Sequence, residues 1–177
     1  MEKEKSAAQR AQPPIVSIVG RAKVGKTTFL VKLIAELTRR GVKVAVIKHT
    51  VHTFDFSQAG KDTWKHAAAG APIVALSSPK ELVITQPLED ECPIDEIAAT
   101  LVSMQGDVDL ILTEGYKEAH KPKIEVSRRE RGTEPVSRPE EIIAIVSDHP
   151  IALDVPRFDL DDATGVADLI QSRYLSH

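Results

Sequence analysis

The chain has 177 residues, of which 42% are apolar and only 4% aromatic, and this composition predicts one domain with an aliphatic core. Its 23 basic and 26 acidic residues give no electrostatic reason to expect nucleic-acid binding, and no apolar run approaches the roughly 20 residues of a membrane span. The polar N-terminus does not read as a signal peptide, and the one cysteine, Cys92, excludes an internal disulfide, so we expect a cytoplasmic protein.

After a flexible polar tail at residues 1–13, short apolar runs alternate with longer amphipathic ones, which predicts a single domain over residues 14–177. Near-continuous apolar strands alternating with helices are typical of an α/β fold with a mostly parallel sheet and helices on both faces. The predicted strands are Ile15–Val19, Val42–Ile47, Ile73–Leu76, Leu82–Thr85, Val108–Thr113, Ile124–Val126 and Ile142–Val146, and the predicted helices are Thr27–Arg40, Asp62–Ala69, Pro93–Val102 and Thr164–Leu175.

A phosphate-binding loop is predicted between the first strand and the first helix. The segment that carries it is Gly20-Arg21-Ala22-Lys23-Val24-Gly25-Lys26-Thr27, a full match to G-x-x-x-x-G-K-[ST] in the right context. The glycines allow the backbone N–H groups to converge on phosphate oxygens at the positive end of a helix. Lys26 is expected to reach the β- and γ-phosphates, and the Thr27 hydroxyl to join a Mg²⁺ shell.

Other residues of this loop are weaker candidates for the same nucleotide site. Lys23 and Val24 lie within the motif, and Thr28 offers a further hydroxyl near the α-phosphate. Together with the motif they predict a P-loop NTPase-like domain that binds a nucleoside triphosphate and magnesium.

An acidic residue near the metal is expected at the end of a neighbouring strand. Glu114 follows the apolar run that starts at Val108, at the carboxyl end where ligands bind in such sheets, whereas Asp109 lies near the opposite end. Five residues of strand separate the two by roughly 16 Å, so only one can reach the metal, and we choose Glu114. A solvated acid at the start of a loop is the alternative interpretation of Glu114.

Further polar residues follow other predicted strands and are expected along the same edge. They are Lys48 and His49, Arg128, and Asp148. Because strands end in polar residues in any fold, their convergence carries more weight than any one of them.

Three longer stretches make the chain resemble the MobB family, the molybdopterin-guanine dinucleotide biosynthesis adapter proteins. The resemblance covers residues 14–175, and the second and third stretches are the more specific. They are the loop at Gly20–Thr28; Lys48-His49-x-x-His52 with Asp55, Gly60-Lys61-Asp62 and Ala69-Gly70-Ala71; and Glu114-Gly115-Tyr116-Lys117 with Pro122-Lys123-Ile124-Glu125-Val126 and Arg128.

The resemblance implies a homodimeric GTP-binding protein with slow hydrolysis that assists attachment of GMP to molybdopterin. It implies two partners, the molybdopterin guanylyltransferase and the protein that inserts molybdenum. By position, Gly25, Lys26 and Thr27 carry over as phosphate and Mg²⁺ contacts and Glu114 as the second acid. Lys48, His49, Lys61 and Asp62 carry over as members of a characteristic segment, without individual roles.

The chain departs from common GTP-binding proteins in how it would recognise the base. The usual guanine-recognition motif Asn-Lys-x-Asp is absent. Our hypothesis is that Asp148 recognises guanine, with its carboxylate accepting hydrogen bonds from N1–H and the 2-amino group. No glutamine or arginine is assignable from sequence to the hydrolytic step, which favours slow turnover.

Two other functions remain open from sequence. A metal-delivery GTPase would use His49 and His52, since neutral imidazoles suit Zn²⁺ or Ni²⁺; their alternatives are a mobile loop over the nucleotide or ordinary solvation. A small-molecule kinase would need an arginine-bearing lid, and residues 128–140 contain four arginines. A further hypothesis is that Leu82–Thr85 forms an edge strand that pairs with the same strand of a second protomer.

Overall fold

The computed structural model describes residues 12–50 and 62–175, whose contacts group into two compact units. The main unit comprises residues 1–49 and 94–177, and the small unit comprises residues 50–93. Each unit has a sheet of its own. The sequence predicts one domain over residues 14–177, and this stays a prediction because the contacts divide the chain into two units.

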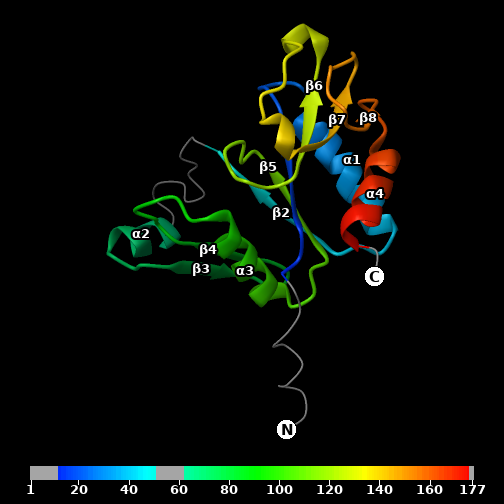
Figure 1. Ribbon diagram of the computed structural model, residues 1–177. Helices are drawn as coiled ribbons and strands as arrows, with labels where there is room; N and C mark the ends of the chain where they lie inside the picture. Colours follow the sequence, from blue (N-terminus) through cyan, green and yellow to red (C-terminus); the bar gives the residue numbers. More distant parts are fainter. Residues whose placement is uncertain (1–11, 51–61, 176–177) are drawn as a thin grey trace. The chain divides into compact units, whose positions relative to one another are not determined.

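The main unit is built on a six-stranded sheet in the order β2-β5-β1-β6-β7-β8 (Figure 1). All five neighbouring pairs are parallel, which confirms the α/β fold predicted from the sequence. Parallel strands place all their carboxyl ends along one edge, which we call the carboxyl edge, and their amino ends along the other. The strands are β1 (Ile15–Val19), β2 (Val44–Lys48), β5 (Leu110–Glu114), β6 (Lys123–Ser127), β7 (Ile142–Ser147) and β8 (Arg157–Phe158).

Helices cover both faces of this sheet. Helices α1 (Lys26–Arg39) and α4 (Ala163–Ile170) pack on one face, and α3 (Ile94–Gln105) packs on the other. Successive side chains of a strand point to opposite faces, so Val16 and Ile18 join the core under α1 while Ile15 joins the core under α3.

The apolar stripe of α1 explains why this helix lies flat on the sheet. Phe29, Leu30, Leu33 and Leu37 recur at helical spacing and are all buried. Complete burial of one leucine side chain stabilises the fold by about 1.5–3 kcal/mol. The helix begins at the carboxyl edge and ends near Gly41, as the sequence predicts.

The C-terminal region differs in detail from the predicted helix over Thr164–Leu175. The α-helix α4 starts one residue earlier, after Asp162, whose carboxylate accepts a hydrogen bond from the N–H of Gly165 at 2.8 Å. A π-helical turn, Gln171–Leu175, follows α4 and completes the predicted span. The two-residue strand β8 was not predicted from the sequence, and neither were the 3₁₀ turns Arg129–Arg131 and Pro139–Glu141.

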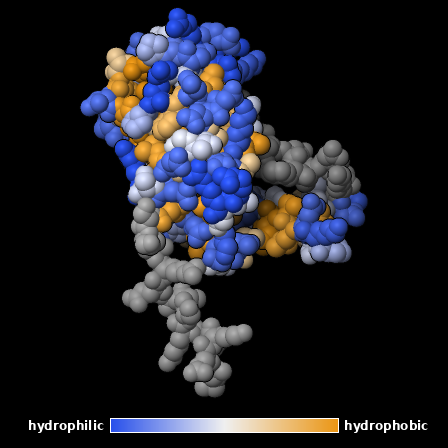
Figure 2. Space-filling model, turned by 90° about the vertical axis from the view of Figure 1, so that its right-hand side faces the viewer, coloured by the Kyte–Doolittle hydropathy of each residue, from blue (hydrophilic) through white to orange (hydrophobic). Residues whose placement is uncertain are grey.

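The small unit contains α2 (Asp62–Ala68) and an antiparallel hairpin of β3 (Val74–Ser77) and β4 (Leu82–Thr85). These elements match the predicted ones to within a residue, but their burial does not resemble that of the main sheet. Every residue of β4 is exposed, including Leu82 at 56% and Ile84 at 44%. Hydrophobic residues are orange in Figure 2, where orange surface is exposed on the face shown.

No helix within residues 12–50 and 62–175 is long and apolar enough to cross a membrane.

Candidate nucleotide-binding site

The loop between β1 and α1 has the backbone conformation that its glycines permit. Gly20 has a φ of 141°, and a Cβ there would lie 2.2 Å from the carbonyl oxygen of Val126 in β6. Gly25 has a φ of 98° and immediately precedes α1. Lys23 adopts a φ of 62°, which is uncommon for a residue with a side chain. The close approach of β6 therefore requires glycine at position 20.

Lys26 places its ammonium group across this loop. Its Nζ donates hydrogen bonds to the carbonyl oxygens of Gly20 at 3.2 Å and Arg21 at 2.8 Å. Burial lowers the pKa of Lys26 below its usual value, the Glu114 carboxylate opposes that shift, and Lys117 and Lys48 lower the pKa further. Lys48 and Lys117 thus add positive charge near the ammonium group of Lys26, and a bound anion would stabilise this arrangement.

Thr27 and Glu114 come together at the carboxyl edge as the sequence predicts. The Thr27 hydroxyl donates to Oε1 of Glu114 at 2.7 Å, and Nζ of Lys48 lies 3.5 Å from Oε2 of the same carboxylate. Glu114 is the last residue of β5, which neighbours the loop-bearing strand β1. A hydroxyl and a carboxylate are hard oxygen ligands of the kind Mg²⁺ takes, usually with several waters, so these two residues fit a magnesium ion.

Asp109 serves a different purpose at the amino edge. Its Oδ2 accepts a hydrogen bond from the N–H of Lys43 at 2.9 Å, and its own N–H donates to the carbonyl oxygen of Lys43 at 2.9 Å. These bonds tie the start of β5 to the start of β2. The carboxylate therefore acts in joining the two strands.

His49 packs beside the loop that follows β5. Its ring stacks on Tyr116, with centroids 4.5 Å apart, and its N–H donates to the carbonyl oxygen of Glu114 at 2.9 Å. A Cβ on Gly115 would come within 3.2 Å of His49, which explains glycine between Glu114 and Tyr116. Among residues 12–50 and 62–175, no three His, Cys, Asp or Glu side chains are grouped so that they could hold a metal ion.

Asp148 lies just past β7 and is exposed at the carboxyl edge. Its Oδ1 accepts from the N–H of Arg129 at 2.9 Å and lies 3.0 Å from Nδ1 of the buried His149. The hydrogen bonds from His149 and from the N–H of Arg129 lower the pKa of Asp148 below its usual value, so this group stays ionised at neutral pH. The contact between Asp148 and His149 was not predicted from the sequence, although the two residues are adjacent.

The segment after β6 runs along the phosphate-binding loop. Nε of Arg128 donates to the carbonyl oxygen of Val24 at 3.0 Å, and Nη2 of Arg21 donates to that of Glu134 at 3.4 Å. The buried carboxylate of Glu125 accepts from the N–H groups of Val136 at 2.6 Å and Ser137 at 3.1 Å. Residues 128–137 are therefore fixed to β6 and to the P-loop.

Other candidates of the sequence analysis stay predictions. Thr28 and Lys23 are exposed. Asp62 starts α2 in the small unit, where its carboxylate accepts from Nζ of Lys65 at 3.0 Å. The remaining members of the characteristic segment, His52, Asp55 and Lys61, lie outside the described residues.

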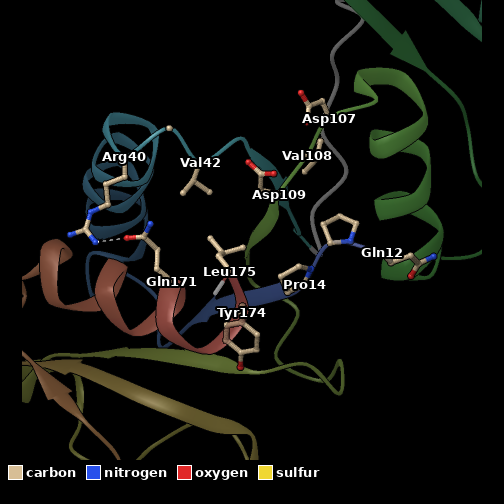
Figure 3. A pocket seen from close by; sticks show the side chains of 12 residues that line it. Gln12, Pro14, Arg40, Val42, Asp107, Val108, Asp109, Gln171, Tyr174 and Leu175 are labelled. Carbon is tan, nitrogen blue, oxygen red and sulfur yellow. Dashed lines mark hydrogen bonds between the residues drawn. The ribbon is translucent and has the colours of Figure 1, made fainter. Parts of the chain in front are cut away.

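A cavity of about 540 Å³ opens at the amino edge, away from the phosphate-binding loop (Figure 3). Figure 3 shows Arg40 hydrogen-bonded to Gln171 at one side of the cavity and Asp109 at the other side, with Val42 between Arg40 and Asp109. None of the residues that line it is a predicted nucleotide contact. The two edges of the sheet thus differ in both shape and chemistry.

Comparison with known proteins agrees with this fold. The family described as "MobB: Molybdopterin guanine dinucleotide synthesis protein B" matches residues 15–148. The molybdopterin-guanine dinucleotide biosynthesis adapter protein of Escherichia coli is 36% identical over 171 residues, covering 92% of this chain and 94% of the relative. The Haemophilus influenzae protein of the same name is 34% identical over 170 residues, covering 94% of this chain and 92% of the relative.

Solved structures of MobB proteins have the same fold as this chain. The crystal structure of Bacillus subtilis MobB superposes with a TM-score of 0.70 at 26% identity, covering 91% of this chain and 98% of that one. A crystal structure titled molybdopterin-guanine biosynthesis protein B superposes with a TM-score of 0.63 at 28% identity, covering 89% and 98%. The family match spans the phosphate-binding loop, Glu114 and Asp148 alike. On this sequence and structural agreement, the chain belongs to the MobB family of molybdopterin guanine dinucleotide synthesis proteins.

Proposed function

We propose that this protein is a GTP-binding adapter with slow GTPase activity that assists attachment of GMP to molybdopterin. The observation that carries the proposal is the arrangement of Lys26, Thr27 and Glu114 at one strand–helix junction. Relatives at 34–36% identity are named as adapter proteins of molybdopterin-guanine dinucleotide biosynthesis, which supports the second half of the proposal.

The triphosphate binds along the loop from Gly20 to Thr27. The N–H groups of the loop and the positive end of α1 bind the phosphate oxygens, and Lys26 exchanges its two carbonyl partners for the β- and γ-phosphates. The Thr27 hydroxyl and the Glu114 carboxylate would hold magnesium, which would supply positive charge to neutralise the phosphates. Lys48, next to Glu114, keeps that carboxylate oriented until the ion binds.

Guanine is recognised by Asp148 at the end of β7. Oδ1 of this carboxylate is engaged by the N–H of Arg129 and by His149, and these bonds hold the carboxylate at the end of β7. An ionised carboxylate can accept from both N1–H and the 2-amino group of guanine, whereas adenine presents an acceptor at N1. The lowered pKa of Asp148 keeps the acceptor in its charged form.

Slow hydrolysis follows from what surrounds the γ-phosphate position. Fast P-loop GTPases use a glutamine to orient water and an arginine to stabilise the transition state. No glutamine of the described residues follows a strand at the carboxyl edge. GTP turnover therefore acts as a timer, and nucleotide-dependent partner binding is the main activity.

The partners are the molybdopterin guanylyltransferase and the molybdenum-insertion protein, and the protein acts as a homodimer. The hairpin of the small unit supports self-association, because Leu82–Thr85 is apolar and exposed along its whole length. An exposed apolar edge strand pairs readily with another strand, including that of a second copy.

A pull-down with the purified full-length chain tests the proposal. Beads carrying the chain are incubated with the guanylyltransferase in the presence of GTP, GDP or no nucleotide, all with Mg²⁺. We expect more transferase to be retained with GTP than with the other two. Equal retention in all three conditions, together with no GTP binding by calorimetry, would contradict the proposed function.

A further inference from the structure

The guanidinium group of Arg128 lies beside the phosphate-binding loop. Arg128 directly follows β6, and its Nε donates to the carbonyl oxygen of Val24 at 3.0 Å. A Cβ built on Gly25, the residue that precedes α1, would lie 3.7 Å from both Nε and Nη2 of Arg128. The guanidinium is therefore in contact distance of the point where phosphate oxygens meet the first N–H groups of the helix.

This guanidinium carries no carboxylate partner among the described residues. By contrast, Arg39 and Arg40 both bind Glu36 through short ion pairs. Asp161 is influenced by Arg128 but is itself hydrogen-bonded to Nζ of Lys32 at 2.5 Å, and these positive groups lower the pKa of Asp161. A half-buried cation at the positive end of a helix is unfavourable alone, and an anion bound there would remove that cost.

The backbone around Arg128 is held in place before any ligand binds. The N–H of Arg131 donates to the carbonyl oxygen of Arg128 at 2.9 Å, and the N–H of Arg129 donates to Asp148. Farther along the segment, buried Glu125 holds Val136 and Ser137. Since Nε is already engaged by Val24, Nη1 and Nη2 remain as paired donors in a fixed direction.

We propose that Arg128 is a phosphate-contacting residue of the nucleotide site, with its two Nη groups donating to a phosphate that GDP and GTP share. The inference rests on the proposed function, since it requires a nucleotide at the loop. The choice of phosphate follows from strand order: Arg128 comes from β6 on one side of β1, whereas Glu114 and Lys48 come from β5 and β2 on the other side. The metal and the γ-phosphate belong to the side of Glu114.

Calorimetric titration of the full-length protein with GDP and with GTP, both with Mg²⁺, tests the inference. Charged hydrogen bonds contribute about 1.5–3 kcal/mol, so Arg128→Gln should weaken both nucleotides by about 10- to 100-fold. Arg128→Lys should lie between the wild type and Arg128→Gln, because it keeps the charge and loses the paired donors. The matched control is Arg131→Gln, an equal charge change in the same segment at a residue paired with exposed Glu130.

Several results would overturn the inference. The first is an Arg128→Gln variant that binds GDP and GTP with the affinity of the wild type. The second is an Arg128→Gln variant that loses affinity for GTP but not for GDP. The third is an Arg131→Gln variant that loses as much affinity as Arg128→Gln. Thermal melting without nucleotide shows whether each variant folds, and if Arg128→Gln does not fold, the Lys variant decides by the same criteria. If the wild type binds GTP and Arg128→Gln binds it equally, only this inference fails; if the wild type binds no GTP, the proposed function fails with it.

Discussion

The two ends of strand β5 carry the same functional group in different surroundings. At the carboxyl end, Glu114 accepts from the Thr27 hydroxyl at 2.7 Å and lies near Lys48. At the amino end, Asp109 accepts from a backbone N–H and joins two strands. The surroundings differ because the carboxyl end of β5 lies near the start of α1 and the ends of the neighbouring strands, whereas the amino end lies near the starts of strands and the end of α1.

The contrast extends along the whole sheet. The carboxyl edge gathers Lys26, Lys48, Glu114, Arg128 and Asp148 next to the positive end of a helix, which suits an anionic ligand. The amino edge has the cavity near Arg40 and Asp109, where basic groups are already paired with acids: Arg40 with Asp168 at 2.6 Å, and Lys43 with Asp107. Charges that satisfy one another leave little for a ligand, so position in the sheet separates the proposed binding residues from the residues that pair with one another.

The strongest test of the contrast compares a lysine at each edge. Lys26→Ala should weaken GTP binding by on the order of 100-fold, because charged hydrogen bonds to phosphate are lost. Lys43→Ala, which removes an exposed lysine paired with Asp107, should leave GTP affinity unchanged. Calorimetry measures both, and circular dichroism checks folding. Equal affinities of the two variants would refute the assignment of the loop.

The next largest expected effect on GTP binding comes from Asp148, the residue proposed to recognise guanine. Asp148→Ala should weaken GTP by about 10- to 100-fold, the usual value of a paired base contact, and leave ATP binding unchanged. The measurement is the ratio of the GTP and ATP dissociation constants. Should that ratio stay at its wild-type value, another residue reads the base and Asp148 only fixes Arg129 and His149.

Glu114, the last residue of β5, and Asp109, which directly precedes β5, provide two contrasting substitutions. Glu114→Gln should weaken Mg²⁺-dependent GTP binding by about tenfold, because an ionised metal ligand becomes neutral. Asp109→Ala should leave GTP binding as it is and lower the free energy of unfolding by about 0.5–1.5 kcal/mol, since one hydrogen bond is lost. GTP titrations at several Mg²⁺ concentrations and denaturant unfolding separate the two effects. A reversed pattern would exchange the assigned roles.

The smallest effect concerns pH. Burial lowers the pKa of Lys26, so its ammonium group loses its proton at a lower pH than an ordinary lysine, whose pKa is about 10.4. GTP affinity should accordingly fall as the pH rises toward that value, by a few-fold before exposed lysines titrate. Affinity measured across this alkaline range checks the prediction, with Lys26→Ala as the control that should lack the dependence. A flat wild-type profile would contradict it.

Much of the main unit follows from local sequence. The β-branched run before Gly20 and the leucine spacing of α1 predict β1 and α1 to within one residue, because burial on one or both faces sets the pattern. The choice of Glu114 over Asp109 also follows from sequence, since strand direction alone decides which end meets the loop. β8 is two residues long and carries too little pattern to be predicted.

The burial of the strands does not follow from sequence. β4 reads as apolar as β1, yet its residues are exposed while those of β1 are buried, because burial depends on which surface packs against the strand. In the same way, His149 supports Asp148 and Glu125 holds residues 136 and 137 through contacts that no sequence spacing encodes.

The sequence by itself determined the strand–helix alternation, the phosphate-binding loop and the acid opposite it, because each depends on residue spacing and chain direction over a few neighbouring residues. Only the tertiary structure decided that β5 and β6 flank β1, and that Arg128 therefore lies against the loop without a carboxylate partner among the described residues. Strand order is set by how helices and sheet pack together, and residues about 100 positions apart become neighbours only through that packing.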